Sequence, residues 1–529
     1  MKNLPIGINT LQTIIDNNMI YVDKTKIAHR LLDNPGRYFL SRPRRFGKSL
    51  FVDTLKEIFD GNRELFKGLF IYDNWNWNNK YPVIKIDFAG GVIRNRAELD
   101  ERLLYILKSN SERLKLEFKT DTDIAGIFTN LIKYSLQKHN SKVVILIDEY
   151  DKPLLDNIEK PEIIPEVRDG LKNLYSVIKE QDANLQFVFL TGVSKFSKVN
   201  IFSGINNLND ITLDKDFATI CGYTENDLDT IFKEHLVGVD REELKKWYNG
   251  YNFLGDKVYN PFDILLFIQK DKSYRNYWFE TGTPTFLIKL FQKNKYFLPE
   301  LDNIVVGEEL LSSFEIDRIE PVTLLFQTGY LTIKETFVEM SRLLFRLKFP
   351  NFEVKTSFHE YLISGYTDLT QARLQYERST YDALMRADLP QFEKTIRRLF
   401  AAIPYRNFTN NNLPDFEGYY ASVLYAFFAA INCEIIAEDI TNQGQVDMTV
   451  MLGDNIFVME IKLVKGSGEL NHGAEKSGEL GENLALKQIK EMNYAQKYVG
   501  IEGKSVFEVG IVFGSEVRNV LQFDFVKRG

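Results

Sequence analysis

The chain carries, between residues 38 and 49, the run Tyr38-Phe39-Leu40-Ser41-Arg42-Pro43-Arg44-Arg45-Phe46-Gly47-Lys48-Ser49. Its first three residues favour a short buried strand, and the apolar positions that follow Ser49 recur at helical spacing. A strand, a loop ending in Gly-Lys-Ser and a helix form the context of a phosphate-binding loop, because backbone N–H groups at a helix N-terminus attract phosphate oxygens. The run therefore predicts a nucleotide site.

The residues of this loop have separate expected roles. Lys48 would reach the β- and γ-phosphates of ATP, and the Ser49 hydroxyl would ligate Mg²⁺. The complete motif has glycine where this chain has Arg42, and a chance Gly-Lys-Ser in a basic surface loop is the alternative. The expected nucleotide-binding residues are Arg44, Arg45, Phe46, Gly47, Lys48 and Ser49.

A second strand-like run predicts the acidic half of the same site. Residues 143–147 are all aliphatic and are followed by Asp148 and Glu149. Asp148 would hold Mg²⁺ through water, and Glu149 would orient or deprotonate the attacking water. Another strand, 186–190, ends near Thr191 and Ser194, either of which could sense the γ-phosphate; a turn with solvated hydroxyls is an equally good interpretation.

The first 215 residues alternate near-continuous apolar runs with helix-like stretches, which is typical of a parallel sheet buried on both faces. We expect strands at 38–40, 83–88, 143–147 and 187–190, and an α/β fold overall. The expected domains are 1–215 (P-loop core), 216–285 (a helical lid starting at the capping box Thr224 to Asp227), 286–400 (a mixed α/β connecting region with a strand at 329–333) and 401–529 (a C-terminal α/β domain).

Composition narrows the class of protein. Hydrophobic residues make up 44% of the 529, as in soluble globular proteins. Cys221 and Cys433 lie far apart in sequence, which excludes a disulfide framework or zinc knuckle and fits a reducing compartment. No signal peptide or membrane-length apolar run is visible in the sequence, so we expect a cytoplasmic protein without a membrane partner.

Charge is distributed unevenly. Residues 1–50 carry nine Lys/Arg against three Asp, a local charge of +6, which suits a polyphosphate ligand. Residues 401–529 carry eleven Lys/Arg against seventeen Asp/Glu, a local charge of −6. The acidic segment argues against a non-specific grip on nucleic acid, because neutralised phosphates supply most of that affinity.

Acidic and basic residues end a strand-like run in this C-terminal segment. Glu460 and Lys462 share one strand face, because side chains alternate along a strand. A two-residue turn at Asp454 and Asn455 would put Asp447 opposite Lys462 on that face, whereas a three-residue turn would move it to the other face. On one face, Asp447 and Glu460 could hold Mg²⁺ or Mn²⁺ and Lys462 could stabilise negative charge during phosphodiester hydrolysis.

Other features bear on this carboxylate site. Glu417, before an apolar helix, could add a third carboxylate. The basic helix at 394–398 could grip a nucleic acid. The alternative is a hairpin with solvated charges, or a nuclease-like fold that does not cut. Gln445 and Val446 are not the small or basic residues expected beside such a site, and the Gly- and Glu-rich loop 465–482 lies next to it.

Segments 21–25, 42–49, 147–153 and 190–196, with a block at 247–263, resemble the bacterial AAA-ATPase-like family over roughly the first 285 residues. That family tolerates arginine at position 42, and its members are usually fused to a C-terminal domain of the PD-(D/E)XK nuclease superfamily. The pattern of that domain is similar to Glu417, Gly444-x-x-Asp447, Glu460-x-Lys462, Gln488 and Tyr494, over about residues 405–515. We interpret the aromatic residues at 247–263 as core packing.

The resemblance implies an ATP-binding and ATP-hydrolysing protein with Mg²⁺, fused to a metal-dependent nuclease acting on DNA or RNA. The alternative is a regulatory ATPase switch whose nuclease-like domain is a non-catalytic binding module. The expected catalytic residues are Glu149, Asp447, Glu460 and Lys462. The expected metal ligands are Ser49, Asp148, Glu417, Asp447 and Glu460.

Overall fold

The computed structural model describes residues 1–528 except 118–121, 196–206, 279–286, 288, 292–295, 303, 313–319, 368, 370–371, 405–415 and 465–480. The chain forms two compact units. The first contains Met1–Thr281 and Val305–Phe352, and the second contains Gly282–Ile304 and Glu353–Gly529. The expected connecting region at 286–400 is thus divided between the units, because its sheet packs with the first and its long helices pack with the second.

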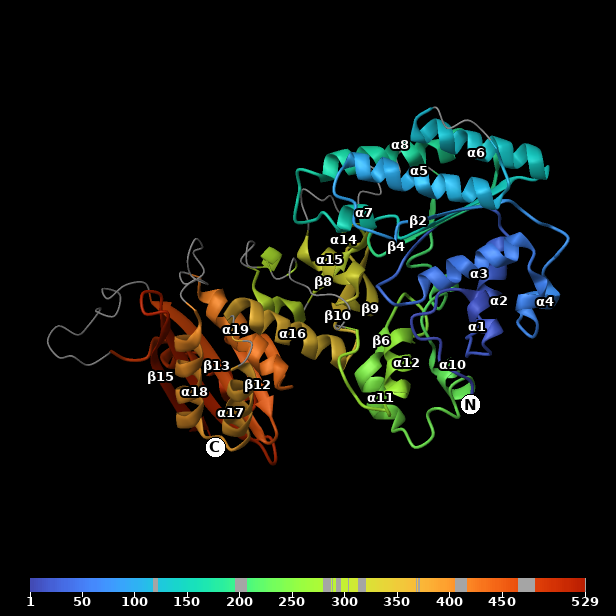
Figure 1. Ribbon diagram of the computed structural model, residues 1–529. Helices are drawn as coiled ribbons and strands as arrows, with labels where there is room; N and C mark the ends of the chain where they lie inside the picture. Colours follow the sequence, from blue (N-terminus) through green and yellow to red (C-terminus); the bar gives the residue numbers. More distant parts are fainter. Residues whose placement is uncertain are drawn as a thin grey trace. The chain divides into compact units, whose positions relative to one another are not determined.

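A parallel five-stranded sheet lies at the centre of the first unit, in the order β2-β3-β4-β1-β5. Its strands β2 and β4 are labelled in Figure 1. The expected strands and the α/β class are confirmed. The acidic strand β3 and the phosphate-loop strand β1 both pair in parallel with β4, which lies between them. Their carboxyl ends therefore lie at the same edge of the sheet. The strands are β1 (Arg37–Ser41), β2 (Val83–Asp87), β3 (Val143–Asp148), β4 (Leu185–Gly192) and β5 (Asn209–Asp210).

Helices cover both faces of this sheet. Figure 1 shows α5, α6 and α8 side by side on one face and α3 on the other. All six residues of β3 are buried, which explains its continuous apolar run. The helices of this part are α1 (Leu11–Asp16), α2 (Thr25–Leu32), α3 (Lys48–Asp60), α4 (Ile71–Asn74), α5 (Arg96–Arg113), α6 (Ile124–His139), α7 (Lys152–Leu155) and α8 (Ile164–Glu180).

The region after Tyr223 is helical, as expected, but a small hairpin interrupts it. The predicted capping box is confirmed: the Thr224 side chain accepts from the Asp227 N–H, and the Asp227 side chain accepts from the Thr224 N–H. The hairpin forms between residues 249 and 259, where tyrosines favour strand over helix. The elements are α10 (Glu225–Thr230), α11 (Arg241–Tyr248), β6 (Asn249–Tyr251), β7 (Val258–Tyr259) and α12 (Pro261–Gln269).

A separate antiparallel sheet, β8-β10-β9, completes the first unit. The strand expected at 329–333 begins only at Thr332. Gly329 ends α15 with φ +93°, and the N–H groups of Tyr330 and Leu331 turn back to the Leu325 carbonyl as a helix cap. The elements are β8 (Val305–Gly307), α14 (Glu308–Ser312), α15 (Pro321–Thr328), β9 (Thr332–Glu339) and β10 (Arg342–Lys348).

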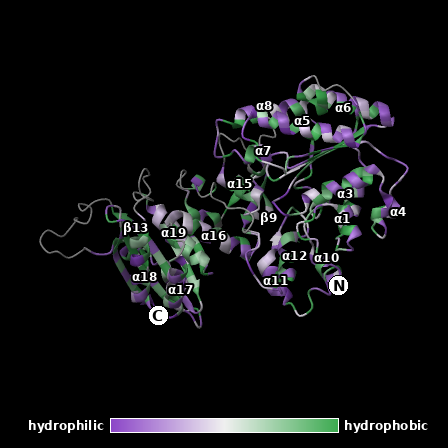
Figure 2. Cartoon of the chain, viewed as in Figure 1, coloured by the Kyte–Doolittle hydropathy of each residue, from purple (hydrophilic) through white to green (hydrophobic). Residues whose placement is uncertain are grey.

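The second unit is built on a five-stranded sheet in the order β11-β12-β13-β14-β15, in which only β13 and β14 pair in parallel. Strand β13 is mostly hydrophobic (Figure 2), and α19 is buried from Gly418 to Ala429. Its elements are α16 (Phe352–Thr367), α17 (Arg373–Met385), α18 (Leu389–Ala402), α19 (Glu417–Ala430), β11 (Glu434–Ile440), β12 (Gln445–Leu452), β13 (Asn455–Val464), α20 (Leu484–Glu491), β14 (Ser505–Gly514) and β15 (Asn519–Arg528).

Within the described part of the chain, no helix combines the length and the hydropathy that a membrane crossing needs.

Candidate functional site

The phosphate loop lies between β1 and α3, as expected. Gly47 precedes α3 with φ +91°, and Arg45 also has a left-handed φ of +68°. Gly47 supplies no side-chain cap to α3, and the N–H groups of a helix's first turn have no intrahelical partner. Together with the helix dipole, they form an anion-binding end.

Lys48, Ser49 and Asp148 meet at this end. The Lys48 ammonium group donates to the carbonyl oxygens of Arg42 and Pro43, each at 3.0 Å, and the side chain is buried. The Ser49 side chain hydrogen-bonds to Asp148. The second carboxylate oxygen of Asp148 is buried and has no hydrogen-bond partner. Burial raises the pKa of Asp148, which the Ser49 hydrogen bond opposes.

Glu149 follows in an uncommon backbone conformation. Its φ is +52°, in the left-handed region that non-glycine residues seldom adopt. Its N–H donates to the Asp148 carboxylate at 3.0 Å, and its carbonyl accepts from the Lys152 N–H at 3.0 Å. Burial and then the charge of Asp148 raise the pKa of Glu149. A higher pKa makes this carboxylate a stronger base.

The two expected sensor residues behave differently. The Thr191 hydroxyl is buried at the end of β4 and has no hydrogen-bond partner. The Ser194 hydroxyl donates to the Asp151 carboxylate at 2.6 Å, and that carboxylate also accepts from the Ser194 and Val193 N–H groups. Ser194 therefore fixes the loop, and Thr191 is the better candidate for contact with a ligand.

Arg42, where the complete motif has glycine, faces away from the loop. Its guanidinium donates to the carbonyl oxygens of Thr212 at 2.8 Å and Phe217 at 3.2 Å, and lies 3.8 Å from the ring centroid of Phe253. Burial lowers its pKa to about 10. The arginine thus ties the loop to the segment that follows β5 and to the ring of Phe253 in the β6–β7 hairpin.

Replacing Arg42 with alanine should therefore destabilise the first unit by about 2 kcal/mol or more, because the carbonyl oxygens of Ser41, Thr212 and Phe217 lose a charged donor. The matched control is Arg44→Ala, which removes the same charge from an exposed side chain and should change stability by less than about 0.5 kcal/mol. Chemical denaturation followed by tryptophan fluorescence measures both. Equal stability of the two variants would show that the Arg42 contacts contribute nothing.

The remaining loop residues divide between solvent and core. Arg44 and Arg45 are exposed, and the Arg45 guanidinium lies 4.7 Å from the ring centroid of Phe262. Phe46, expected to bind nucleotide, buries its side chain against Tyr251 at 4.7 Å between ring centroids, so only its backbone is available to a ligand. The aromatic side chain belongs to the core because it anchors the loop.

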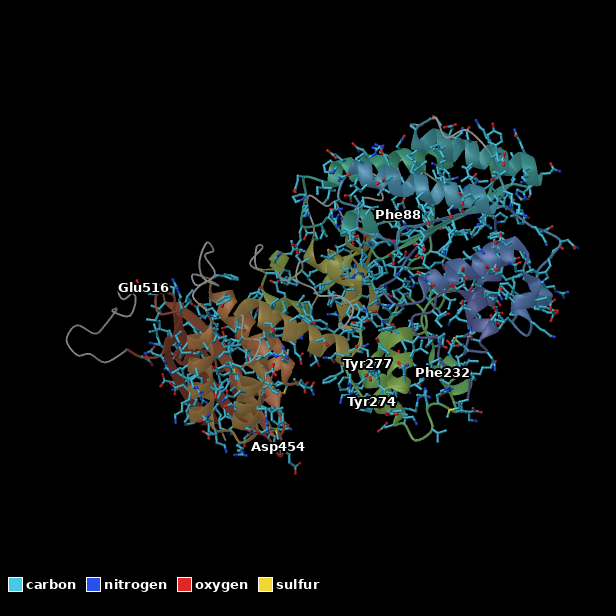
Figure 3. The ribbon with its side chains drawn as sticks, viewed as in Figure 1. Phe88, Phe232, Tyr274, Tyr277, Asp454 and Glu516 are labelled. Atoms are coloured by element: carbon cyan, nitrogen blue, oxygen red, sulfur yellow. The ribbon has the colours of Figure 1, made fainter. Side chains whose placement is uncertain are left out.

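The aromatic block at 247–263 is mainly core, as expected. Tyr248 packs against Tyr274 and Tyr277, both labelled in Figure 3, with ring centroids 6.1 Å apart in each pair. Phe262 is the exception, since it lines the cavity beside the phosphate loop.

That cavity has a volume of about 640 Å³ and two chemically different walls. The polar wall contains the phosphate loop and Glu149. The other wall comes from distant parts of the chain and is largely apolar, a composition that suits a flat heterocycle. Its apolar members include Pro5, Ile8, Tyr223, Pro261, Phe262 and Leu265.

Asp87 is a site residue that the sequence reasoning missed. It ends β2 and pairs with Asp148 across the β2–β3 ladder, and its charge contributes to the raised pKa of Asp148. The available signal was its position at the carboxyl end of a parallel strand, next to the strand that carries the acidic pair.

The carboxylate site of the second unit lies on the β12–β13 hairpin. The turn is formed by Gly453 and Asp454, with Gly453 at φ +59°; Asp454 is labelled in Figure 3. Met448 pairs with Met459 and Leu452 with Asn455, so neither the Asp454–Asn455 turn nor a three-residue turn is present. Glycine takes the left-handed position that the turn requires, and this moves the register by two residues.

The two-residue shift leaves the side chains on the expected face. The same register brings Asp447 opposite Glu460, and the Asp447 carboxylate accepts from the Ile461 N–H at 2.6 Å. The Lys462 ammonium group lies 2.8 Å from a Glu460 carboxylate oxygen. Glu417, the first residue of α19, accepts from the Leu463 N–H at 2.8 Å. The structure thus brings these four residues together.

The carboxylates influence one another. Burial and the charge of Glu460 raise the pKa of Asp447 to about 7. Burial also raises the pKa of Glu460, although the Lys462 hydrogen bond opposes this. Among the described residues, no three His, Cys, Asp or Glu side chains are arranged as ready metal ligands. Asp447 and Glu460 remain the two carboxylates that could share an ion.

Gln488, the basic helix at 394–398 and the loop 465–482 are the other features expected at this site. Gln488 on α20 donates to the Tyr494 hydroxyl at 3.5 Å. Arg397 of the basic helix is engaged with Glu393 and with the carbonyl oxygens of Val520 and Leu521, so it is not free to bind phosphate. Most of the loop 465–482 falls outside the described residues.

Comparisons with known proteins agree with this geometry. A model of the predicted AAA-ATPase family matches residues 5–202, and a model of the PD-(D/E)XK nuclease superfamily matches residues 415–523. The uncharacterized protein in the vnfD 5'region of Azotobacter chroococcum mcd 1 is 44% identical over 523 residues, which cover 99% of this chain and 98% of that one.

Two solved structures show weaker similarity. The ORC2 protein of Aeropyrum pernix, in ADPNP–ADP complexes, is 14% identical with a TM-score of 0.32, over 80% of this chain and 91% of that one. The ORC1 protein of Aeropyrum pernix in complex with DNA is 12% identical with a TM-score of 0.26, over 66% and 96%. At these scores, nothing about this chain follows from either likeness.

Proposed function

Because the chain belongs to the family of predicted AAA-ATPases with a C-terminal domain of the PD-(D/E)XK nuclease superfamily, we propose that it binds and hydrolyses ATP and that its C-terminal domain cleaves nucleic acid with a divalent metal. The observation that carries the ATPase part is the 640 Å³ cavity that the phosphate loop shares with Glu149 and an apolar wall. We also propose that residues 1–285 act as the ATPase region and 401–529 as the nuclease region.

The residues fit ATP with Mg²⁺. The unpartnered oxygen of buried Asp148 and the adjacent Ser49 hydroxyl are hard oxygen ligands, which Mg²⁺ prefers. Bound there, Mg²⁺ would neutralise phosphate charge. Lys48 adds a positive charge at the same loop, while the apolar wall suits the adenine ring.

Hydrolysis requires a water molecule placed in line with the γ-phosphate. Glu149 lines the cavity and has a raised pKa, so it is suited to take the proton of the attacking water. The water oxygen then bonds to the γ-phosphorus while the bond to the bridging oxygen breaks, which leaves ADP and inorganic phosphate. Thr191, whose buried hydroxyl has no hydrogen-bond partner, is the proposed residue for orienting the water or the γ-phosphate.

The Glu149→Gln variant tests this function. It should bind ATP as tightly as the unmodified protein, because Asp148 and the phosphate loop are unchanged. Its hydrolysis rate should fall by roughly 10²-fold or more, the effect expected when a general base is lost. Phosphate release measures the rate, and titration with a fluorescent ATP analogue measures the affinity.

Two results would contradict the proposal. An unmodified protein that releases no phosphate from ATP in Mg²⁺ is not an ATPase. Parallel loss of binding and hydrolysis in Glu149→Gln would mean that Glu149 maintains the loop, since its φ of +52° makes it structurally demanding. Thermal denaturation of the variant separates the second case from simple unfolding.

The nuclease part is supported by three charged side chains on one face of the hairpin. Asp447 and Glu460 offer oxygen ligands to Mg²⁺ or Mn²⁺, which would polarise the scissile phosphate. Lys462 lies 2.8 Å from Glu460 and is placed to stabilise the negative charge that develops during cleavage. The proposed substrate is a nucleic acid, DNA or RNA.

A regulatory ATPase with a non-catalytic C-terminal module is the second candidate. The observation in its favour is that Glu417, Asp447 and Glu460 already have hydrogen-bond or ion-pair partners within the protein. Direct assay of metal-dependent cleavage distinguishes the two functions.

A further inference from the structure

An aromatic cavity adjoins the carboxylate site of the second unit. Its volume is about 550 Å³. It is lined by Tyr296, Phe297, Glu300, Phe416, Glu417 and Asp447, with Gly418 and Ala421 of α19 at its base. Glu417 and Asp447 belong to the carboxylate site, so the cavity opens directly beside the side chains proposed to hold the metal.

One wall of the cavity comes from a segment far away in sequence. The chain enters the second unit at Gly282–Ile304, before it returns to the first unit. This segment is anchored on α19 and β11 by the short 3-10 helix Leu298–Asp302. Leu298 and Leu301 are fully buried, and the Leu298 N–H donates to the Ser422 hydroxyl at 3.2 Å. The anchored helix holds Phe297 at the cavity.

A third aromatic ring of the cavity, that of Phe416, packs closely on a glycine. A Cβ atom at Gly418 would lie 2.4 Å from the Phe416 ring, so the absence of a side chain lets the ring fold over the start of α19. Tyr296, Phe297 and Phe416 all line the cavity and are partly exposed. Aromatic rings that line a cavity are suited to stacking against a flat group.

The charge of the cavity lining determines which part of a nucleic acid the cavity can bind. The three charged side chains that line the cavity are all carboxylates: Glu300, Glu417 and Asp447. Burial, followed by the charge of Glu438, raises the pKa of Glu300. An acidic cavity repels phosphate but accepts an uncharged base, whose faces can stack on the rings. Phosphates would instead remain with the metal at the cavity edge.

From this arrangement we propose that the cavity binds an unpaired nucleobase next to the scissile phosphate, and that the substrate of the second unit is single-stranded nucleic acid. A base in a duplex is stacked and paired, so it reaches such a cavity only after it leaves the helix. Stacking on aromatic side chains tolerates any sequence, because every base has a π face. This inference rests on the proposed nuclease function.

The test is a binding measurement with the full-length protein in Ca²⁺, using fluorescence anisotropy of a labelled twelve-residue oligothymidylate. Three probes are compared: this strand, its duplex with oligoadenylate, and a strand with the same backbone but abasic sites. The single strand should bind on the order of 10-fold more tightly than the abasic strand, the size of one base–aromatic stack. The duplex should bind no better than the abasic strand.

Variants test whether the aromatic rings of the cavity cause this difference in affinity between the normal and abasic strands. Phe297→Ala should weaken binding of the normal single strand on the order of 10-fold and leave the abasic strand unchanged. Gly418→Ala should act in the same direction by displacing the Phe416 ring, although alanine favours the helix and should preserve its stability. Phe525→Ala, which removes a ring that is 41% exposed elsewhere in the unit, is the matched control and should change neither.

Equal binding of the normal and abasic strands, or equal weakening of both by Phe297→Ala, would overturn the base-binding cavity. A parallel cleavage assay in Mn²⁺ distinguishes failure of the base-binding cavity from failure of the proposed nuclease function. If binding follows the expected pattern but no strand is cut, the nuclease function fails and the cavity stands. If single strand and duplex are cut equally well and Phe297→Ala has no effect, the cavity fails and the nuclease function stands.

Discussion

Lys48→Ala is expected to abolish ATP hydrolysis and to weaken ATP binding by roughly 10²-fold, the loss of a charged hydrogen-bond donor to phosphate. The reason lies in the geometry of the loop. The Lys48 ammonium group is buried and within 3.0 Å of two loop carbonyl oxygens, so its charge is already placed at the N-terminus of α3. Phosphate oxygens would meet a preplaced cation in a site of low dielectric.

The experiment needs variants that separate charge from packing. Lys48→Met keeps the length of the side chain and removes only the charge, so it should lose hydrolysis as Lys48→Ala does. Lys56→Ala, further along α3, removes an ion pair with Glu57 and Asp60 and should hydrolyse ATP normally. Phosphate release and nucleotide titration provide the readouts. Normal hydrolysis by Lys48→Met would refute the nucleotide assignment.

The phosphate loop could be predicted because its signal is local. A strand, a loop and a helix follow one another within residues 37–60, and their order alone places Lys48 at the helix end. The partners of Arg42 were not predictable in this way. Thr212, Phe217 and Phe253 are about 170 to 210 residues away in sequence, and only the folded chain brings their carbonyl groups and ring to the guanidinium.

The apolar wall of the ATP cavity was not predictable for the same reason, because its residues lie far apart in sequence. Pro5 and Ile8 precede the loop by some forty residues, whereas Phe262 and Leu265 follow it by more than two hundred. Each residue alone is an ordinary apolar side chain in a loop or helix. Their common function depends on tertiary contacts, which hydrophobic periodicity does not encode.

The carboxylate hairpin shows how a wrong register can still predict the right face. Side chains alternate with a period of two, so an error of two residues leaves each side chain on the same side of the sheet. The expected turn at Asp454 and Asn455 differs from the observed turn at Gly453 and Asp454 by two in register. The opposing partner of Asp447 changed from Lys462 to Glu460, yet all three side chains still share one face.

This partner change affects the proposed chemistry. A carboxylate opposite a carboxylate makes a paired site for a cation, and burial, followed by the charge of Glu460, raises the pKa of Asp447 to about 7. A divalent ion would relieve that repulsion. An acidic domain can bind a polyanion in this way, because bound cations become the largest local charges.

Glu460→Ala is accordingly expected to eliminate metal-dependent cleavage of single-stranded nucleic acid, with a loss on the order of 10³-fold. Lys462→Ala should lower the rate by roughly 10²-fold or more, because it removes charge stabilisation at the reacting phosphate without removing a metal ligand. The two variants should differ in metal binding: titration with Mn²⁺ should show weaker binding only for Glu460→Ala. Lys504 is an exposed residue of the same unit, so the Lys504→Ala variant is the control and should cut normally.

Cleavage that survives in Glu460→Ala at the unmodified rate would mean that another site, or a contaminating enzyme, does the cutting. Absence of cleavage in the unmodified protein, with or without ATP, would instead favour the regulatory ATPase. The hydrogen bonds that Asp447 accepts from Ile461 and Glu417 accepts from Leu463 would then stabilise the fold and would not prepare a metal site.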